Sequence, residues 1–193
     1  AQVYAPAFTN YVEGIYVGYK YYETAAQEGA IDYDKTVQYP FGYGLSYTEF
    51  EQKMGELEEK DGQISVDVEV TNSGDVAGKD VVEVYYKPPY TNGGIEKSSA
   101  NLIEFEKTNL LQPGESQTVT VTFSIEDMAS YDENNAKAYV LEKGDYVISI
   151  NSDSHTVLDQ KTYTADKDVV YKGENKRASD DTAATNVFED AKG

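Results

Sequence analysis

Carboxylates are the most abundant side chains in this sequence that could do chemistry. Its 193 residues include 35 aspartates and glutamates, 16 lysines and arginines, and one histidine. Two carboxyl groups held about 5 to 5.5 Å apart can cleave a glycosidic bond, one as the nucleophile and the other as the acid/base. Because 35 acidic residues place a pair in almost any window, composition alone identifies no catalytic pair.

The single histidine, His155, follows Asp153 and Ser154 and could bind a metal or act as a general base. Both roles need convergent partners, which the local sequence does not indicate. We therefore expect a solvated histidine in a loop. Asp180 and Asp181 could attract calcium, but the spacing of an EF-hand loop is absent, so an ordinary turn is expected. The sequence predicts no metal site and no cofactor site.

Three further side chains and one loop could contact a sugar or a partner. Glu13 follows a tyrosine cluster, although a hydrogen bond to the backbone near Gly14 is the simpler expectation. Tyr43 and Tyr47 could stack on a sugar ring. The simpler expectation is that their rings pack between two domains while each hydroxyl forms a hydrogen bond. The polar loop from Tyr90 to Ser99 could reach a neighbouring active site or subunit, and it equally fits a mobile connection.

The most informative stretch is residues 39–50, YPFGYGLSYTEF, named the aromatic segment below. Gly42 and Gly44 suit a tight, closely packed loop, because glycine reaches positive φ and lets the backbone approach its neighbours. Pro40 fixes its own φ and favours an extended Tyr39. We predict that the segment lies at an interface between two packed domains. The residues assigned to this interface are Tyr39, Pro40, Phe41, Gly42, Tyr43, Gly44, Leu45 and Tyr47.

Residues 1–49 contain ten of the 18 tyrosines. Such a stretch is too apolar for a disordered tail, yet it has too few elements to form a layered domain alone. Within it, residues 14–17 are β-prone, a helical turn can follow them, and residues 25–35 have the composition of a loop. We predict a non-autonomous edge of a larger domain that packs on a neighbour.

From residue 50 onward the pattern predicts strands. Residues 64–71 and 117–123 alternate strictly between apolar and polar side chains, which is typical of strands with one dry face. Residues 56–62 are predicted as a charged lead-in to an Asp-Gly turn, and residues 126–128 as one helical turn. Further strands are predicted over residues 79–86, 102–111, 137–141, 146–150 and 157–163.

Short strands separated by turn signals every 8 to 12 or so residues are typical of an antiparallel β-sandwich of the immunoglobulin or fibronectin III type. The predicted fold is therefore mainly β. The sandwich is assigned to residues 50–165, and the polar tail, residues 166–193, has the composition of a linker.

Charge and composition exclude several classes of partner. The net charge of −19 would repel the phosphates of nucleic acids and an anionic membrane surface. No apolar run approaches the roughly 20 residues that a membrane-spanning helix needs. Residues 1–10 lack the pattern of a signal peptide, and the absence of cysteine fits a reducing compartment such as the cytoplasm. Since many exported bacterial proteins also lack cysteine, the compartment stays undetermined.

Several of these stretches together resemble one family. Residues 13–23 (EGIYVGYKYYE) and the aromatic segment resemble the end of the second domain of glycoside hydrolase family 3 enzymes, the β-glucosidase and β-xylosidase group. Residues 70–89, 110–132 and 141–154 resemble strands of the fibronectin type III-like domain of these enzymes. The resemblance covers residues 10–155.

The resemblance implies that the parent protein is a retaining, β-glucosidase-like glycoside hydrolase. In the family the nucleophile aspartate lies in a barrel domain and the acid/base glutamate lies in an α/β domain. Neither motif occurs in this sequence, so the resemblance implies a chain without catalytic residues that is inactive alone. Residues 176–193 resemble the connector of a subgroup with reversed domain order, in which the barrel follows the fibronectin-like domain. Val187 and Phe188, two apolar residues with nothing nearby in the sequence to pack against, fit that arrangement.

The implied domains are the edge of an α/β sandwich domain (residues 1–49), a fibronectin type III-like domain (residues 50–165) and a linker toward a barrel (residues 166–193). The leading hypothesis is an accessory region that braces the α/β and barrel domains and meets a glycoside only through the parent enzyme. A homo-oligomer is left open.

The alternative is a free-standing carbohydrate-binding or adhesion module, which the lack of tryptophan and of an aromatic row on the wet strand faces disfavours. A structural spacer is a third hypothesis.

Overall fold

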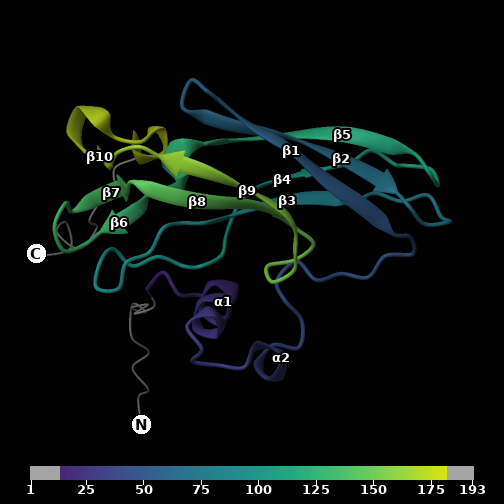
Figure 1. Ribbon diagram of the computed structural model, residues 1–193, viewed down its shortest axis with the longest axis horizontal. Helices are drawn as coiled ribbons and strands as arrows, with labels where there is room; N and C mark the ends of the chain where they lie inside the picture. The colour runs from purple at the N-terminus through teal and green to yellow at the C-terminus, as the bar shows by residue number, and fades with distance from the viewer. Residues whose placement is uncertain (1–13, 182–193) are drawn as a thin grey trace, which may run out of the picture.

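Two antiparallel sheets face each other across one hydrophobic core in the computed structural model, which describes residues 14–181 (Figure 1). The first sheet has the order β1-β2-β5 and the second the order β4-β3-β8-β9. The strands of the first sheet are β1 (Phe50–Lys60), β2 (Gln63–Asn72) and β5 (Ser116–Ser124). Those of the second are β3 (Val81–Lys87), β4 (Asn101–Lys107), β8 (Gly144–Asn151) and β9 (Val157–Ala165). The predicted mainly β, antiparallel sandwich is confirmed.

Strict alternation in β2 and β5 places their apolar side chains in the core. Ile64, Val66 and Val68 of β2 are almost completely buried, and they lie opposite Phe123, Val121 and Val119 of β5. The polar partners face outward, where Asp67 accepts a hydrogen bond from the Thr120 hydroxyl. Because side chains alternate between the faces of a strand, the sequence period alone determined which face is dry.

Strand β1 was not predicted, because residues 56–62 were interpreted as a charged lead-in. Its inward positions carry few apolar side chains, chiefly Met54 and Leu57, and the register shifts between these two residues. The irregularity interrupts the period of two that identifies a strand. The Asp61-Gly62 turn that follows is confirmed: both residues have positive φ, as a tight two-residue hairpin requires.

A third, smaller sheet extends one end of the sandwich. It has the order β10-β7-β6 and follows the short helix η1 (Ile125–Met128), which confirms the predicted helical turn. Its strands are β6 (Ser130–Asp132), β7 (Ala138–Leu141) and β10 (Val169–Tyr171). Strands β6 and β10 have three residues each and were not predicted, because no periodicity can be recognised in so short a stretch.

Residues 169–181 were predicted as part of a linker, yet they fold against this third sheet. Strand β10 pairs with β7, and the short helices η2 (Gly173–Asn175) and η3 (Ala178–Asp181) follow. The guanidinium carbon of Arg177 lies 3.3 Å from the centroid of the Tyr139 ring, and an Arg177 nitrogen lies 2.7 Å from Asp180. The hydrogen bond from Arg177 holds the pKa of Asp180 below its ordinary value. Val187 and Phe188 lie outside the described residues.

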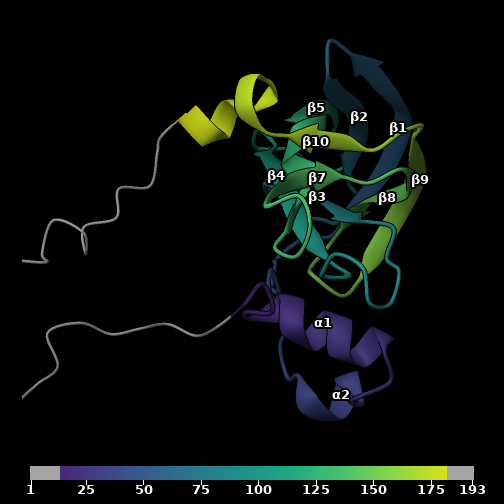
Figure 2. The same cartoon turned by 90° about the vertical axis from the view of Figure 1, so that its left-hand side faces the viewer.

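Two helices lie beneath the sandwich, as the rotated view shows (Figure 2). They are α1 (Tyr19–Gln27) and α2 (Tyr33–Thr36), which together we call the helical segment (residues 19–36). Neither has the length and apolar character of a membrane-spanning helix, and the described residues contain no other candidate. Residues 14–17 form no strand, and the predicted helical turn is extended to nine residues. Gly29 follows α1 with φ 71°, a conformation common after helix ends.

Candidate domain interface

Tyr19 joins α1 to the second sheet. Its ring stacks on Phe41 with centroids 4.9 Å apart and meets the edge of the Tyr85 ring at 6.1 Å. The backbone N–H of Leu102 donates a hydrogen bond of 2.9 Å to its hydroxyl oxygen. Burial raises the pKa of this hydroxyl above its ordinary value. Tyr19 therefore fixes α1, the aromatic segment and strands β3 and β4 relative to one another.

Glu23 is a buried carboxylate one helical turn after Tyr19, with 8% of its surface exposed. It accepts hydrogen bonds from the Tyr33 hydroxyl at 2.6 Å and from the Ser154 hydroxyl at 3.0 Å. Nδ1 of His155 lies 2.9 Å from its other carboxylate oxygen. Burial, followed by the hydrogen bond to Glu23, raises the pKa of Tyr33. This acid thus joins both helices to the loop between β8 and β9.

His155 differs from its prediction as a solvated loop histidine. It lies in a loop, and 42% of its side chain is exposed, but its ring stacks on Tyr33 with centroids 3.7 Å apart and planes at 5°. The prediction was wrong because both partners come from a segment more than 100 residues away in the sequence. Among the described residues, no group of three or more His, Cys, Asp or Glu side chains is placed to hold a metal ion.

The loop between β3 and β4 packs on α1 through residues 96–99. The Ser99 N–H donates a hydrogen bond of 3.0 Å to the Thr24 hydroxyl. The Tyr16 hydroxyl, just before α1, donates to the Glu96 carboxylate. This end of the predicted loop is therefore not a free connection. Its reach toward an active site stays a prediction, and Glu13 lies outside the described residues.

The aromatic segment approaches the sandwich closely at Gly42. This residue has φ 89°, and an added Cβ would lie 3.0 Å from a carboxylate oxygen of Glu83 and 3.3 Å from Cα of Asp153. Beside it, the Ser154 N–H donates a hydrogen bond of 2.8 Å to the carbonyl of Phe41. At Gly44 an added Cβ would meet nothing within 4 Å, so among the described residues only Gly42 of the two approaches the sandwich closely. The assignment of both glycines to a domain interface stays a prediction.

Residues 15–47 expose many large apolar side chains. Leu45 and Tyr47 are 90% and 98% exposed, and the rings of Tyr39 and Tyr43 pack mainly on each other, 5.1 Å apart. Of the 17 exposed large apolar side chains among the described residues, nine belong to this stretch. They are Ile15, Val17, Tyr21, Tyr22, Tyr39, Phe41, Tyr43, Leu45 and Tyr47. So concentrated an apolar surface is typical of a face that another body covers.

Three carboxylates face this part of the molecule from the second sheet and its loops. The pKa of Glu83 is raised, chiefly by burial and then by the charges of Asp153 and Asp80, against the lowering effect of the Tyr85 hydroxyl 3.0 Å away. A raised carboxyl pKa means that the folded protein holds the proton more tightly than the unfolded chain. Ionised Glu83 therefore lowers the stability of the chain above its folded pKa, and the penalty disappears at lower pH.

We predict that Glu83→Gln raises the melting temperature of the chain at pH 7 by a few degrees or less, because the amide still accepts from Tyr85 without carrying charge. The gain should vanish near pH 3, where Glu83 itself is protonated. Thermal unfolding followed by circular dichroism at both pH values measures it. Glu69→Gln, on the exposed face of β2, is the matched control and should change little. An equal gain at both pH values would contradict the electrostatic cause.

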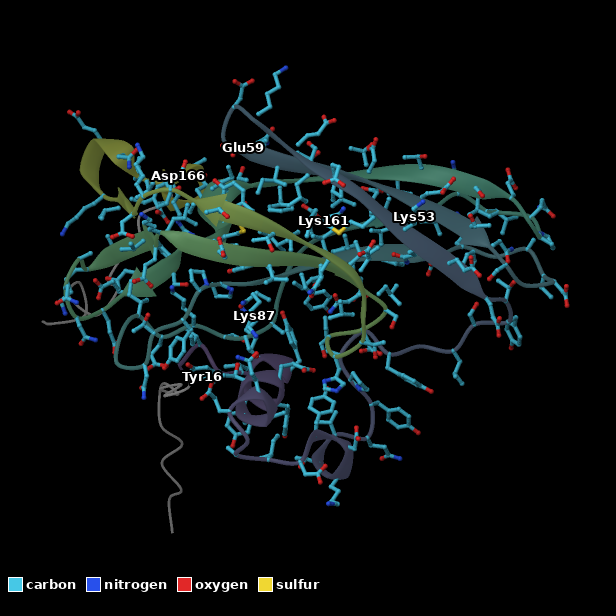
Figure 3. The ribbon with its side chains drawn as sticks, in the orientation of Figure 1. Tyr16, Lys53, Glu59, Lys87, Lys161 and Asp166 are labelled. Carbon is cyan, nitrogen blue, oxygen red and sulfur yellow. The ribbon has the colours of Figure 1, made fainter. Side chains whose placement is uncertain are left out.

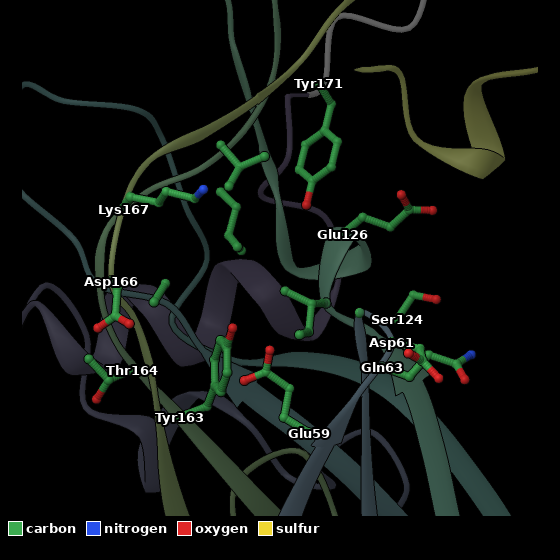
Figure 4. Close-up of a pocket in the computed structure, with 15 residues that line it drawn as sticks. Glu59, Asp61, Gln63, Ser124, Glu126, Tyr163, Thr164, Asp166, Lys167 and Tyr171 are labelled. Atoms are coloured by element: carbon green, nitrogen blue, oxygen red, sulfur yellow. The ribbon is translucent and has the colours of Figure 1, made fainter. Parts of the chain in front are cut away.

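A concavity of about 550 Å³ lies near the β1–β2 turn, and Figure 4 shows the side chains that line it. Its lining includes the acidic residues Glu59, Asp61, Glu126 and Asp166, with Lys167 as the one cation in the lining. Figure 4 shows these side chains spread around the space. This cavity was not predicted, and its acidic lining by itself identifies no chemistry.

Known proteins match both the sandwich and the segment before it. A family model described as a fibronectin type III-like domain matches residues 80–154. A β-glucosidase of Kluyveromyces marxianus is 35% identical over 178 residues, which cover 87% of this chain and 20% of that protein. A β-glucosidase of Ruminococcus albus is 39% identical over 160 residues, covering 81% of this chain and 16% of that protein.

Solved structures agree. The structure of β-glucosidase 3B from Thermotoga neapolitana in complex with α-D-glucose has a TM-score of 0.71 at 35% identity, covering 84% of this chain and 21% of that one. A glycoside hydrolase family 3 β-glucosidase from Bifidobacterium adolescentis has a TM-score of 0.68 at 30% identity, covering 79% of this chain and 21% of that one. This chain is similar to a part of these β-glucosidases that includes a fibronectin type III-like domain. The resemblance predicted from the sequence is confirmed.

The chain spans about a fifth of the length of these relatives. Because the match to the K. marxianus β-glucosidase covers 87% of the chain, it must include part of residues 1–49 as well as the sandwich. At least part of residues 1–49 therefore belongs to the stretch shared with that protein, outside the 80–154 match to the domain family.

Proposed function

We propose that this chain is a non-catalytic accessory region of a β-glucosidase-like enzyme of family 3, and that it acts as a brace between catalytic domains. Residues 1–49 are proposed as the edge of an α/β sandwich domain, residues 50–165 as the fibronectin type III-like domain and residues 166–193 as the connection toward a barrel in reversed domain order. The parent enzyme would hydrolyse a β-glucoside with retention of configuration.

One observation carries this proposal. Residues 15–47 are held on the sandwich by Tyr19 and Glu23, and they still expose nine large apolar side chains. A segment that packs on the sandwich and still exposes a large apolar surface is expected to contact a second domain as well. The sandwich would therefore set the position of the domain that covers these exposed side chains.

A rigid joint matters for a two-carboxylate active site. A misplacement of about 1 Å can cost on the order of a hundredfold in rate, because the reacting atoms must be held in a near-attack geometry. The brace would act through position alone, and no residue of this chain need touch the substrate.

We predict that replacing residues 50–165 of the full-length enzyme by a flexible linker lowers its melting temperature and its kcat together, the latter at least tenfold. The 193-residue chain alone should hydrolyse no aryl β-glucoside above the buffer rate. Thermal unfolding and steady-state kinetics measure both effects. Unchanged kcat and melting temperature after the replacement would refute bracing, and turnover by the isolated chain would refute the non-catalytic assignment.

A further inference from the structure

The loop between β3 and β4, residues 88–100, contains the one Asn-Gly pair in this sequence, Asn92-Gly93. Figure 3 labels Lys87, just before this loop, and Tyr16, whose hydroxyl donates to a carboxylate within it. Both labels lie on the side of the sandwich that faces α1. An asparagine followed by glycine can react with its own backbone, so the surroundings of this pair decide whether it does.

The reaction is an attack of the next residue's backbone nitrogen on the side-chain amide carbon of asparagine. A new C–N bond closes a five-membered succinimide ring, the bond to the amide nitrogen breaks, and ammonia leaves with the proton of the attacking nitrogen. Water then opens the ring at one of its two carbonyl carbons. The product is aspartate or, where the backbone now runs through the side chain, isoaspartate. Glycine favours the attack, because it has no Cβ to crowd the nitrogen.

Two other asparagines precede a serine, another small residue, and the structure restrains both of them. Asn72 is completely buried, its amide nitrogen donates to two carbonyls, and the Ser73 N–H donates to a backbone carbonyl at 2.9 Å. Asn151 is 3% exposed, and the Ser152 N–H donates to a backbone carbonyl at 3.0 Å. In both pairs the attacking nitrogen is held as a donor, and the buried side chain cannot turn onto it.

Asn92 lacks these restraints. Asn92 and Gly93 are both exposed, and neither the Asn92 side chain nor the Gly93 N–H has a hydrogen-bond partner among the described residues. Gly93 has φ 80°, and an added Cβ there would meet nothing within 4 Å. The turn is closed by a hydrogen bond of 2.9 Å from the Gly94 N–H to the carbonyl of Thr91. An exposed turn of this kind opens at little cost, so the side chain can reach the nitrogen and water can reach the ring.

The base of the loop, in contrast, is anchored. The buried Lys97 ammonium donates to the carbonyl of Pro89 at 2.6 Å and pairs with the Glu142 carboxylate. These contacts tie both sides of the loop to the turn between β7 and β8. A chemical change at residues 92–93 is therefore confined to the tip of the loop and leaves the sandwich folded.

We propose that Asn92 deamidates spontaneously in the folded chain, through a succinimide, to a mixture of aspartate and isoaspartate. Both products add a negative charge at the tip of the loop, and isoaspartate also lengthens the backbone by one carbon. The chain therefore becomes a mixture of forms that differ at this tip. The modification rests neither on the bracing function nor on any activity of the full-length enzyme.

Peptide mapping by mass spectrometry, after incubation of the 193-residue chain at pH 8 and 37 °C, tests the site. The peptide that contains Asn92 should gain one mass unit and separate into an aspartate and an isoaspartate form, at least tenfold faster than Asn72 or Asn151 reacts. In guanidinium chloride, Asn72 and Asn151 should react at least tenfold faster than in the folded chain, while the rate at Asn92 changes little. An Asn92 that reacts only in guanidinium chloride, or that yields no isoaspartate, would overturn the proposal.

Ser73→Gly separates the effect of structure from that of sequence. It creates a second Asn-Gly pair, whose asparagine is buried, and it removes an exposed hydroxyl that has no partner among the described residues. In the folded variant Asn72 should still react at least tenfold more slowly than Asn92, whereas in guanidinium chloride the two should react at similar rates. Equal rates in the folded variant would show that the surroundings select no site, and the inference would fail.

Asn92→Gln is the chemical control. Its longer side chain would have to close a six-membered ring, which forms far more slowly, so the loop peptide should keep its mass. Because residue 92 is exposed, the melting temperature should stay unchanged. A mass gain of the same peptide in this variant would show that a different residue reacts, which overturns the assignment of Asn92.

Discussion

The double substitution Leu45→Ala and Tyr47→Ala is expected to leave the 193-residue chain as stable as before and to destabilise the full-length protein. Both side chains are almost completely exposed here, so truncation removes little buried surface. If another domain covers them, each truncation removes on the order of 1.5 to 3 kcal/mol of apolar burial, so the pair should lower the unfolding free energy of the full-length protein by about 3 kcal/mol or more. Denaturant unfolding of both proteins measures the contrast.

The matched control for this experiment is Leu110→Ala with Phe105→Ala. These two side chains are also exposed, at 53% and 58%, and they lie in and just after β4, outside the aromatic segment. We expect no loss of stability from this pair in either protein. Similar losses from both pairs in the full-length protein, or a loss from Leu45 and Tyr47 in the isolated chain, would contradict the interface.

Glu23→Ala is expected to release the helical segment from the sandwich while the two sheets stay folded. The carboxylate accepts from Tyr33 and Ser154 and pairs with His155, and hydrogen bonds to a charged group contribute about 1.5 to 3 kcal/mol each. The substitution removes all of these contacts at once and leaves α1 held mainly by Tyr19 and Thr24. Hydrogen exchange should show protection lost in α1, on the order of a hundredfold, and retained in β2 and β8.

Glu28→Ala, at the exposed end of α1, provides the control and should leave the protection of α1 unchanged. Glu23→Gln should restore part of the protection, since the amide oxygen can still accept from Tyr33. Full protection of α1 in Glu23→Ala would show that the aromatic contacts of Tyr19 suffice to hold the helical segment on the sandwich, and that Glu23 is not needed for this.

Parts of the candidate interface could be predicted from local sequence. Alternating aromatics and glycines indicated that residues 39–47 pack closely, and Gly42 does so with positive φ against Glu83. Glu23 was missed although a signal existed: with residues 19–27 taken as a helix, Tyr19 and Glu23 lie four residues apart and share one face. Its partners Ser154 and His155 could not be inferred, because they follow it by more than 130 residues.

By itself, the sequence determined the strands with a regular period and the Asp61-Gly62 turn, because each of these depends on side chains close together in the chain. The tertiary structure decided what covers each face. Alternation in β8 assigns Ser149 and Asn151 to the outer, nominally wet face, yet the helical segment folds over that face and buries both. A strand's period reports which of its sides meets the core, while the cover on its other side comes from a distant part of the chain.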